Sequence, residues 1–109
     1  MALDETAFDE LAAGIFKRLL SAIDRVDPDL LEADGSSDMV TIAAASGEKV
    51  VVNTQRAARQ LWVAGRGEGV HFTYDAAAGQ WKDDRGRGLE LLAFVARCVR
   101  EASGVALEP

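Results

Sequence analysis

The sequence predicts an α+β fold, a sandwich in which an antiparallel sheet of about five to six strands carries an N-terminal and a C-terminal helix on one face. Helical periodicity marks both ends of the chain, and short strand-like runs separated by turn residues fill the middle. The 109 residues are 49% apolar, which suits one hydrophobic core, and no repeat or linker divides them. We therefore expect a single domain over residues 1–109.

The first helix is predicted to start near Thr6, which forms a capping box with Asp9 in place of the usual Glu. It should end at Asp27-Pro28, because proline disfavours the helical conformation in the residue before it. The apolar side chains at helical spacing are Phe8, Leu11, Ala12, Ile15, Phe16, Leu19, Ile23 and Val26.

Short antiparallel strands are predicted between the helices, with turns at Ser46-Gly47-Glu48 and in the glycine-rich segment Gly65–Gly69. Their expected ranges are Glu32–Asp34 at one edge, Met39–Ala45, Lys49–Gln55, Arg59–Ala64, Val70–Tyr74 and Gln80–Lys82. The last helix should run from about Leu89 to Ser103, with Gly104 as its C-terminal cap.

Alternation along the strands separates two faces of the sheet. The residues expected beneath the helices are Val40, Ile42, Val50, Val52, Leu61, Val63 and Phe72. The residues expected on the other face are Thr41, Asn53, Gln55, Gln60, Trp62, His71 and Thr73. That face is polar apart from Trp62, which either contributes to a binding surface or lies under a loop or a long side chain.

Charge is distributed unevenly along the chain, whose net charge is −6. Residues 1–38 hold ten acids and three bases, whereas residues 39–109 hold eight acids and nine bases. Such a field attracts cations and basic protein surfaces and repels nucleic acid and anionic membranes. An acidic face that only promotes solubility is the alternative.

Three features of the sequence bear on its cellular location. The N-terminus lacks a signal-peptide pattern, no apolar run is long enough to span a membrane, and Cys98 is the single cysteine. These features favour the cytoplasm, and the helical pattern around Cys98 predicts a buried thiol.

Catalytic motifs do not stand out in the sequence. No acid is placed by its spacing beside His71, the sole histidine, and the glycine-rich segment lacks the Lys-Ser/Thr ending of a phosphate loop. Carboxylates remain: Asp24 and Asp27 are three residues apart, and Asp29, Glu32 and Asp34 follow. Oxygen ligands suit hard cations such as Fe²⁺ and Fe³⁺, so these five residues are a candidate for a shallow metal site, and a solvated acidic edge is the alternative.

The stretch Asn53–Ala64, NTQRAARQLWVA, resembles the frataxin signature, in which Asn-x-Gln and Gln-x-Trp are separated by four residues on adjacent strands. Four flanking segments agree with bacterial members of that family: Val40–Ile42, Gly47–Asn53, Gly69–Phe72 and Trp81. The resemblance covers about residues 6–104.

The resemblance implies an α–β sandwich without catalysis of its own and without an organic cofactor. It implies weak, reversible iron binding on an acidic ridge, together with docking on the cysteine desulfurase and the scaffold protein of iron–sulfur cluster assembly. By position the ridge falls on Asp24, Asp27 and Asp29, with Glu32 and Asp34 beside it, and the partner-binding surface falls on Asn53, Gln55, Gln60 and Trp62.

Several positions depart from the family pattern. Leu20 and Ser21 stand where the ridge usually carries acids, Arg25 interrupts it, and Ala57 replaces a common proline. The segment Asp83–Gly88 is expected to be a short loop outside the ridge.

The resemblance to bacterial members favours regulation of the desulfurase as the function. Donation of iron to the scaffold is an alternative, and a carboxylate-metal hydrolase is a more distant one.

Overall fold

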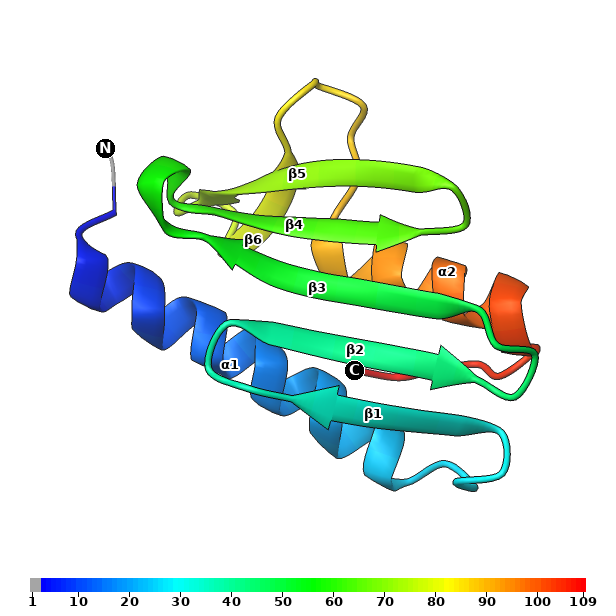
Figure 1. Ribbon diagram of the computed structural model, residues 1–109. Coiled ribbons are helices and arrows are strands. Elements are labelled where there is room, and N and C mark those ends of the chain that lie inside the picture. The colour runs from blue at the N-terminus through cyan, green and yellow to red at the C-terminus, as the bar shows by residue number, and fades with distance from the viewer. Residues whose placement is uncertain (1–2) are drawn as a thin grey trace.

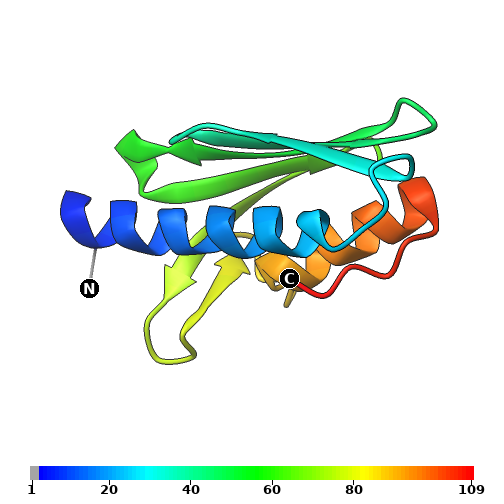
Figure 2. The ribbon, with the colours of Figure 1, turned by 90° about the horizontal axis from the view of Figure 1, so that it is seen from below.

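The computed structural model describes residues 3–109 as two layers, a six-stranded antiparallel sheet and a pair of helices (Figure 1). The chain runs through α1 (Glu5–Asp24), β1 (Leu31–Gly35), β2 (Met39–Ala44), β3 (Lys49–Gln55), β4 (Gln60–Gly65), β5 (Glu68–Asp75), β6 (Gln80–Asp83) and α2 (Leu91–Ser103). A short 3₁₀ turn, Arg56–Ala58, joins β3 to β4. The strands pair in sequence order, and both helices cover the same face of the sheet, as Figure 2 shows from below. The predicted α+β sandwich is confirmed.

The core lies between the sheet and the helices. All seven strand residues predicted to point inward are buried. From the helices Phe8, Leu19, Val95 and Cys98 are fully buried, and burial raises the pKa of the Cys98 thiol. Trp81 on β6 is also buried and meets the Phe8 ring edge-on, at 6.0 Å between centroids. The inward parity read from the sequence therefore holds across the sheet.

Both ends of α1 differ from the prediction. Asp4, not Thr6, caps the helix: its Oδ1 accepts a hydrogen bond from the Ala7 amide at 2.7 Å. The capping box was wrong, because Thr6 already lies in the first turn of the helix. The helix ends at Asp24, after which the Val26 amide bonds to the Ile23 carbonyl at 2.9 Å in a tighter turn.

The connections around β4 depend on positive φ angles. Arg59 has φ 52° and closes the 3₁₀ turn, so β4 begins one residue later than predicted. Arg66 (φ 52°) and Gly67 (φ 77°) form a two-residue hairpin, so the glycine-rich segment belongs mostly to β4 and β5.

The start of α2 was predicted about two residues too early. Glu90 caps the helix and accepts hydrogen bonds from the amides of Leu92 and Ala93. Gly104 forms the C-terminal cap as predicted, with φ 78° and an amide bond to the Arg100 carbonyl at 2.7 Å.

The C-terminal tail runs back between the two helices (Figure 2), which the sequence did not indicate. Leu107 is buried there, and Arg18 and Arg25 on the α1 side donate to the carbonyls of Pro109 and Glu108. Arg25, which interrupts the predicted ridge, thus holds the tail.

Candidate interaction surfaces

The four signature residues come together on the sheet face that carries no helix. Strand register places Asn53 opposite Trp62 and Gln55 opposite Gln60. The Trp62 indole Nε1 donates to Gln60 Oε1 at 2.9 Å, and Gln60 Nε2 donates to Asp84 Oδ2 at 3.1 Å. These contacts hold the indole of Trp62 and the amide of Gln60 in one orientation.

Trp62 is half-buried, and a side chain from the neighbouring strand lies against it. The His71 imidazole stacks on the indole with centroids 3.9 Å apart and planes 8° from parallel. His71 Nδ1 lies 3.6 Å from Asp84 Oδ2. The sequence left this carboxylate unassigned because it is brought to His71 only by the pairing of β5 with the end of β6.

This outer face is more apolar than the predicted set of outward residues, because Met39 and Val51 also belong to it. Met39 lies in the same cross-strand row as Asn53, Trp62 and His71, and its side chain is 46% exposed. Val51 is half-buried on the same face. Trp62 therefore belongs to a mixed apolar and amide surface, a composition suited to a protein partner.

Asp83 does not lie in a loop, so the expectation of a loop over Asp83–Gly88 was wrong at this residue. It is the last residue of β6 and is buried, and its carboxylate accepts hydrogen bonds from the amides of Arg85, Arg87 and Leu89. These backbone hydrogen bonds, that from Arg87 above all, hold the pKa of Asp83 below its usual value. Asp83 shapes the turn into α2.

A cluster of ion pairs around Arg56 was also not predicted from the sequence. Arg56 donates to Asp9 on α1 and, at 2.7 Å, to Asp38 in the turn between β1 and β2. Thr54 also donates to Asp38 at 3.0 Å. The hydrogen bond from Arg56, followed by that from Thr54, lowers the pKa of Asp38. Arg56, which directly follows β3, thus links the end of that strand to α1 and to the β1–β2 turn.

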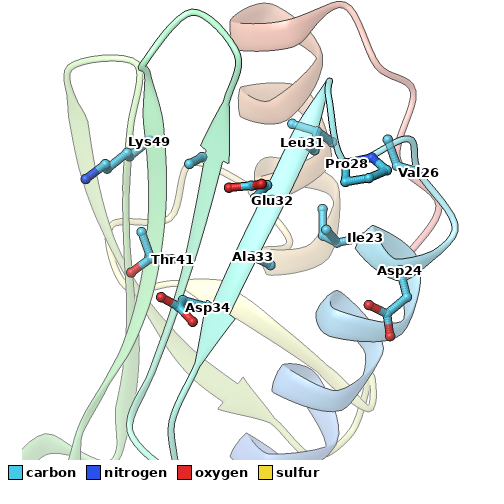
Figure 3. Close-up of a pocket in the computed structure, with 11 residues that line it drawn as sticks. Ile23, Asp24, Val26, Pro28, Leu31, Glu32, Ala33, Asp34, Thr41 and Lys49 are labelled. Atoms are coloured by element: carbon cyan, nitrogen blue, oxygen red, sulfur yellow. The ribbon is translucent and has the colours of Figure 1, made fainter.

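The five candidate metal ligands are all exposed but do not converge. Asp24 ends α1, and Asp27 accepts a hydrogen bond from the Asp29 amide at 2.9 Å, which shapes the turn that follows. Glu32 and Asp34 point from β1 to the opposite side from Asp24 (Figure 3). Within residues 3–109 no group of three or more His, Cys, Asp or Glu side chains could hold a metal ion. The most these acids offer a cation is one or two carboxylates and water.

Leu20, at a position where the resemblance predicts an acid, contributes to packing. A Cβ added at Gly35 would lie 2.9 Å from the Leu20 side chain, so this leucine lies directly against β1. At this position α1 therefore packs on the sheet and offers no carboxylate.

A hollow of about 750 Å³ straddles β1 beside these acids (Figure 3). Its apolar part includes Ile23, Val26, Leu31 and Ala33, and its polar part includes Asp24, Glu32, Asp34 and the single cation Lys49. A second hollow of about 560 Å³ continues along α1, and Asp24 lines both.

Taken together, the sandwich carries two candidate surfaces: the outer sheet face, and an acidic edge along α1 and β1 that consists of Asp24, Asp27, Asp29, Glu32 and Asp34. A family profile described as a frataxin-like domain matches residues 1–105. The chain therefore belongs to the frataxin family, and as a member of it the chain is not an enzyme. The carboxylate-metal hydrolase is set aside accordingly.

Three bacterial proteins named iron–sulfur cluster assembly protein CyaY are similar over nearly their whole length. The protein of Delftia acidovorans is 35% identical, covering 92% of this chain and 95% of that protein. Those of Pseudomonas fluorescens and Shewanella sp. strain ANA-3 are 33% and 34% identical, covering 99% and 98% of this chain and 96% and 98% of those proteins.

The fold also matches a solved frataxin structure from Psychromonas ingrahamii. The TM-score is 0.86 at 24% sequence identity, with 97% of each chain covered. No helix among the described residues is long and apolar enough to cross a membrane.

Proposed function

We propose that this protein regulates iron–sulfur cluster assembly in the bacterial cytoplasm by docking on the cysteine desulfurase and its scaffold protein. The observation that carries the proposal is the assembly of Asn53, Gln55, Gln60 and Trp62 on one uncovered face. The relatives named for this process support it.

The two surfaces would contribute different kinds of binding energy. Trp62 is an aromatic anchor already oriented by His71 and Gln60, so little conformational entropy is lost on docking. The acidic edge would attract a basic surface on the desulfurase and speed the encounter. The same negative charge disfavours nucleic acid and anionic membranes as partners.

Iron would act as an effector or cargo on that acidic edge. Carboxylate oxygens bind Fe²⁺ and Fe³⁺, and the open arrangement makes binding weak and reversible. A cation bound to Asp24, Glu32 or Asp34 neutralises charge that a basic partner would otherwise contact. Iron occupancy would therefore change the affinity for the desulfurase.

Sulfide production by the desulfurase tests this function. The rate is measured with and without the scaffold, this protein and Fe²⁺, and we expect a change that requires this protein and depends on iron. The same rate in every arm would refute the regulatory function.

Cluster formation on the scaffold tests the second candidate, iron donation. Protein preloaded with iron is compared with the same concentration of free iron. Faster cluster formation with unchanged sulfide production would favour donation over regulation.

A further inference from the structure

The two edges of the sheet differ in how they are closed. At the β6 edge, the backbones of Lys82 and Glu90 pair in an isolated antiparallel β-bridge. The chain from Arg85 to Leu89 folds onto the Asp83 carboxylate. At the β1 edge, no strand of the described chain pairs with the side facing away from β2 (Figure 1). An open strand edge is a template for pairing with another chain.

The hydrogen-bond pattern identifies which backbone groups point out from β1. The Ser36 amide bonds to the Met39 carbonyl and the Ala45 amide to the Leu30 carbonyl. The backbone amides and carbonyls of the even-numbered residues of β1 therefore point toward β2. Ala33 and Gly35 therefore direct their amides and carbonyls away from the sheet. The Leu31 amide is already bound to the Asp27 carbonyl. The free edge is centred on Ala33.

Alternation along β1 divides the surroundings of this edge into two kinds. Leu31 and Ala33 lie on the inner side, beside Ile23 and Val26 in the hollow next to α1. Glu32 and Asp34 point to the opposite, outer side (Figure 3). A strand added at this edge would place alternate side chains against an apolar hollow and against two carboxylates.

Charge selects the kind of strand that fits. A second copy of this chain would bring its own Glu32 and Asp34 to the same side, and like charges on neighbouring strands destabilise pairing. Basic side chains opposite these acids would be attracted. Leu20 already covers Gly35, so apolar residues of moderate size suit the inner side.

We infer that β1 docks an extended partner segment by strand addition, a segment in which basic residues alternate with small apolar ones. This inference deepens the proposed docking function and rests on it. The backbone of Ala33 supplies the hydrogen bonds, the hollow beside α1 takes the apolar side chains, and Glu32 and Asp34 take the basic ones.

A short peptide tests the pairing directly. The probe is acetyl-Lys-Val-Lys-Val-Lys-amide, titrated into the ¹⁵N-labelled full chain. We expect the Ala33 amide to move downfield and to exchange more slowly with solvent, as an amide does when it gains a hydrogen bond. The valines would lie opposite the residues of β1 whose backbone amides and carbonyls point away from β2. N-methylation of both valine amides therefore removes the donors that would bond to β1 and keeps the charge of the peptide. That change should weaken binding about tenfold or more.

Ala33→Pro provides the matching change in the protein. Proline removes the outward amide of Ala33 and leaves the amides that bond to β2, and an edge strand tolerates proline in that position. The melting temperature should stay close to that of the wild type, while peptide affinity should fall about tenfold or more. If the variant unfolds, the N-methylated peptide against the wild-type chain still decides the question.

Three results would overturn the inference. Equal binding of the plain and N-methylated peptides would mean that charge alone attracts the segment. Equal binding of an acetyl-Glu-Val-Glu-Val-Glu-amide control would remove the role of Glu32 and Asp34. Dimerisation of the wild-type chain through β1, measured by sedimentation, would assign the edge to a second copy.

Desulfurase binding by Ala33→Pro separates this inference from the proposed function. Undiminished binding by this variant would refute strand addition as the docking mode and leave docking itself intact. Absence of binding by the wild-type chain would refute the proposed function.

Discussion

Trp62 and Trp81 show how strand parity gives one residue type two roles. Trp81 is 2% exposed and packs on Phe8, whereas Trp62 is half-buried on the outer face and stacks on His71. An indole held by a ring and one hydrogen bond remains available to a partner.

Trp62→Ala should therefore weaken partner binding far more than folding. Losing the stack and the hydrogen bond to Gln60 should lower the free energy of unfolding by about 1–2 kcal/mol. Trp81→Ala, the control, leaves a core cavity and should cost about 3–5 kcal/mol. Thermal melts and a desulfurase or scaffold pull-down measure both effects. A stability loss at Trp62 equal to that at Trp81 would contradict the assignment of Trp62 to the surface.

Asp83 contributes stability that depends on pH. Its native pKa lies below the usual value, so its contribution is present above about pH 4 and is lost as the pH falls through the native pKa. The Asp83→Asn variant should unfold at a lower urea midpoint than the wild type at pH 7. The difference between the two urea midpoints should be smaller at pH 3. A difference that stays constant between the two pH values would mean that the charge of Asp83 is not what stabilises the turn.

At the scale of elements, the acidic edge consists of a helix end, a turn and a strand that place their carboxylates differently. Glu32 and Asp34 share one side of β1, and Asp24 lies on the other side. The Asp27 carboxylate accepts a hydrogen bond from the Asp29 amide within the turn after α1. Cation binding should accordingly be centred on β1 and not on the helix.

Titration with Ca²⁺ and with paramagnetic Mn²⁺ checks this expectation. The amides of Glu32 and Asp34 should shift or broaden first, with dissociation constants on the order of 10⁻⁴–10⁻³ M, the weak end for oxygen-ligand sites. The double variant Glu32→Gln, Asp34→Asn should lose the effect. Strongest broadening at His71 and Asp84 would place the cation on the outer face instead.

For the whole molecule, the acidic residues of the first third lie along α1, in the turns on either side of β1 and on β1 itself. Arg56 pairs with Asp9 and Asp38, which removes two of those acids from the free charge and leaves the α1–β1 edge as the negative surface. Screening by salt should then affect docking through this edge.

Neutralising this edge should weaken desulfurase binding by an order of magnitude or more while sparing the fold. The test variant combines Asp24→Asn, Glu32→Gln and Asp34→Asn, all exposed positions. The matched control removes three charges from exposed ion pairs elsewhere, by Glu48→Gln, Glu68→Gln and Glu101→Gln.

Titrations at 0.1 M and 1 M salt complete the comparison, because the Debye length shrinks from about 10 Å to about 3 Å. The wild-type and control complexes should weaken with salt, and the edge variant should respond less. Stronger loss of affinity in the control than in the edge variant would move the docking surface away from β1.

The sequence by itself determined the features that depend on local periodicity and spacing. Alternation separated the inner residues Val40, Ile42 and Phe72 from the outer residues Asn53 and Trp62, because a strand has a period of two whatever its neighbours are. The family could also be identified from spacing, that of Asn53, Gln55, Gln60 and Trp62. Two adjacent strands with a short connection bring residues at this spacing side by side.

Only the tertiary structure decided which distant groups meet. The stack of His71 on Trp62 and the pairing of Arg56 with Asp9 both join residues whose spacing carries no local signal. The separation of Asp24 from Glu32 and Asp34 across β1 is of the same kind, because the packing of α1 on the sheet sets it. Contacts of this sort arise from strand register and from the direction in which the chain returns, and local patterns record neither.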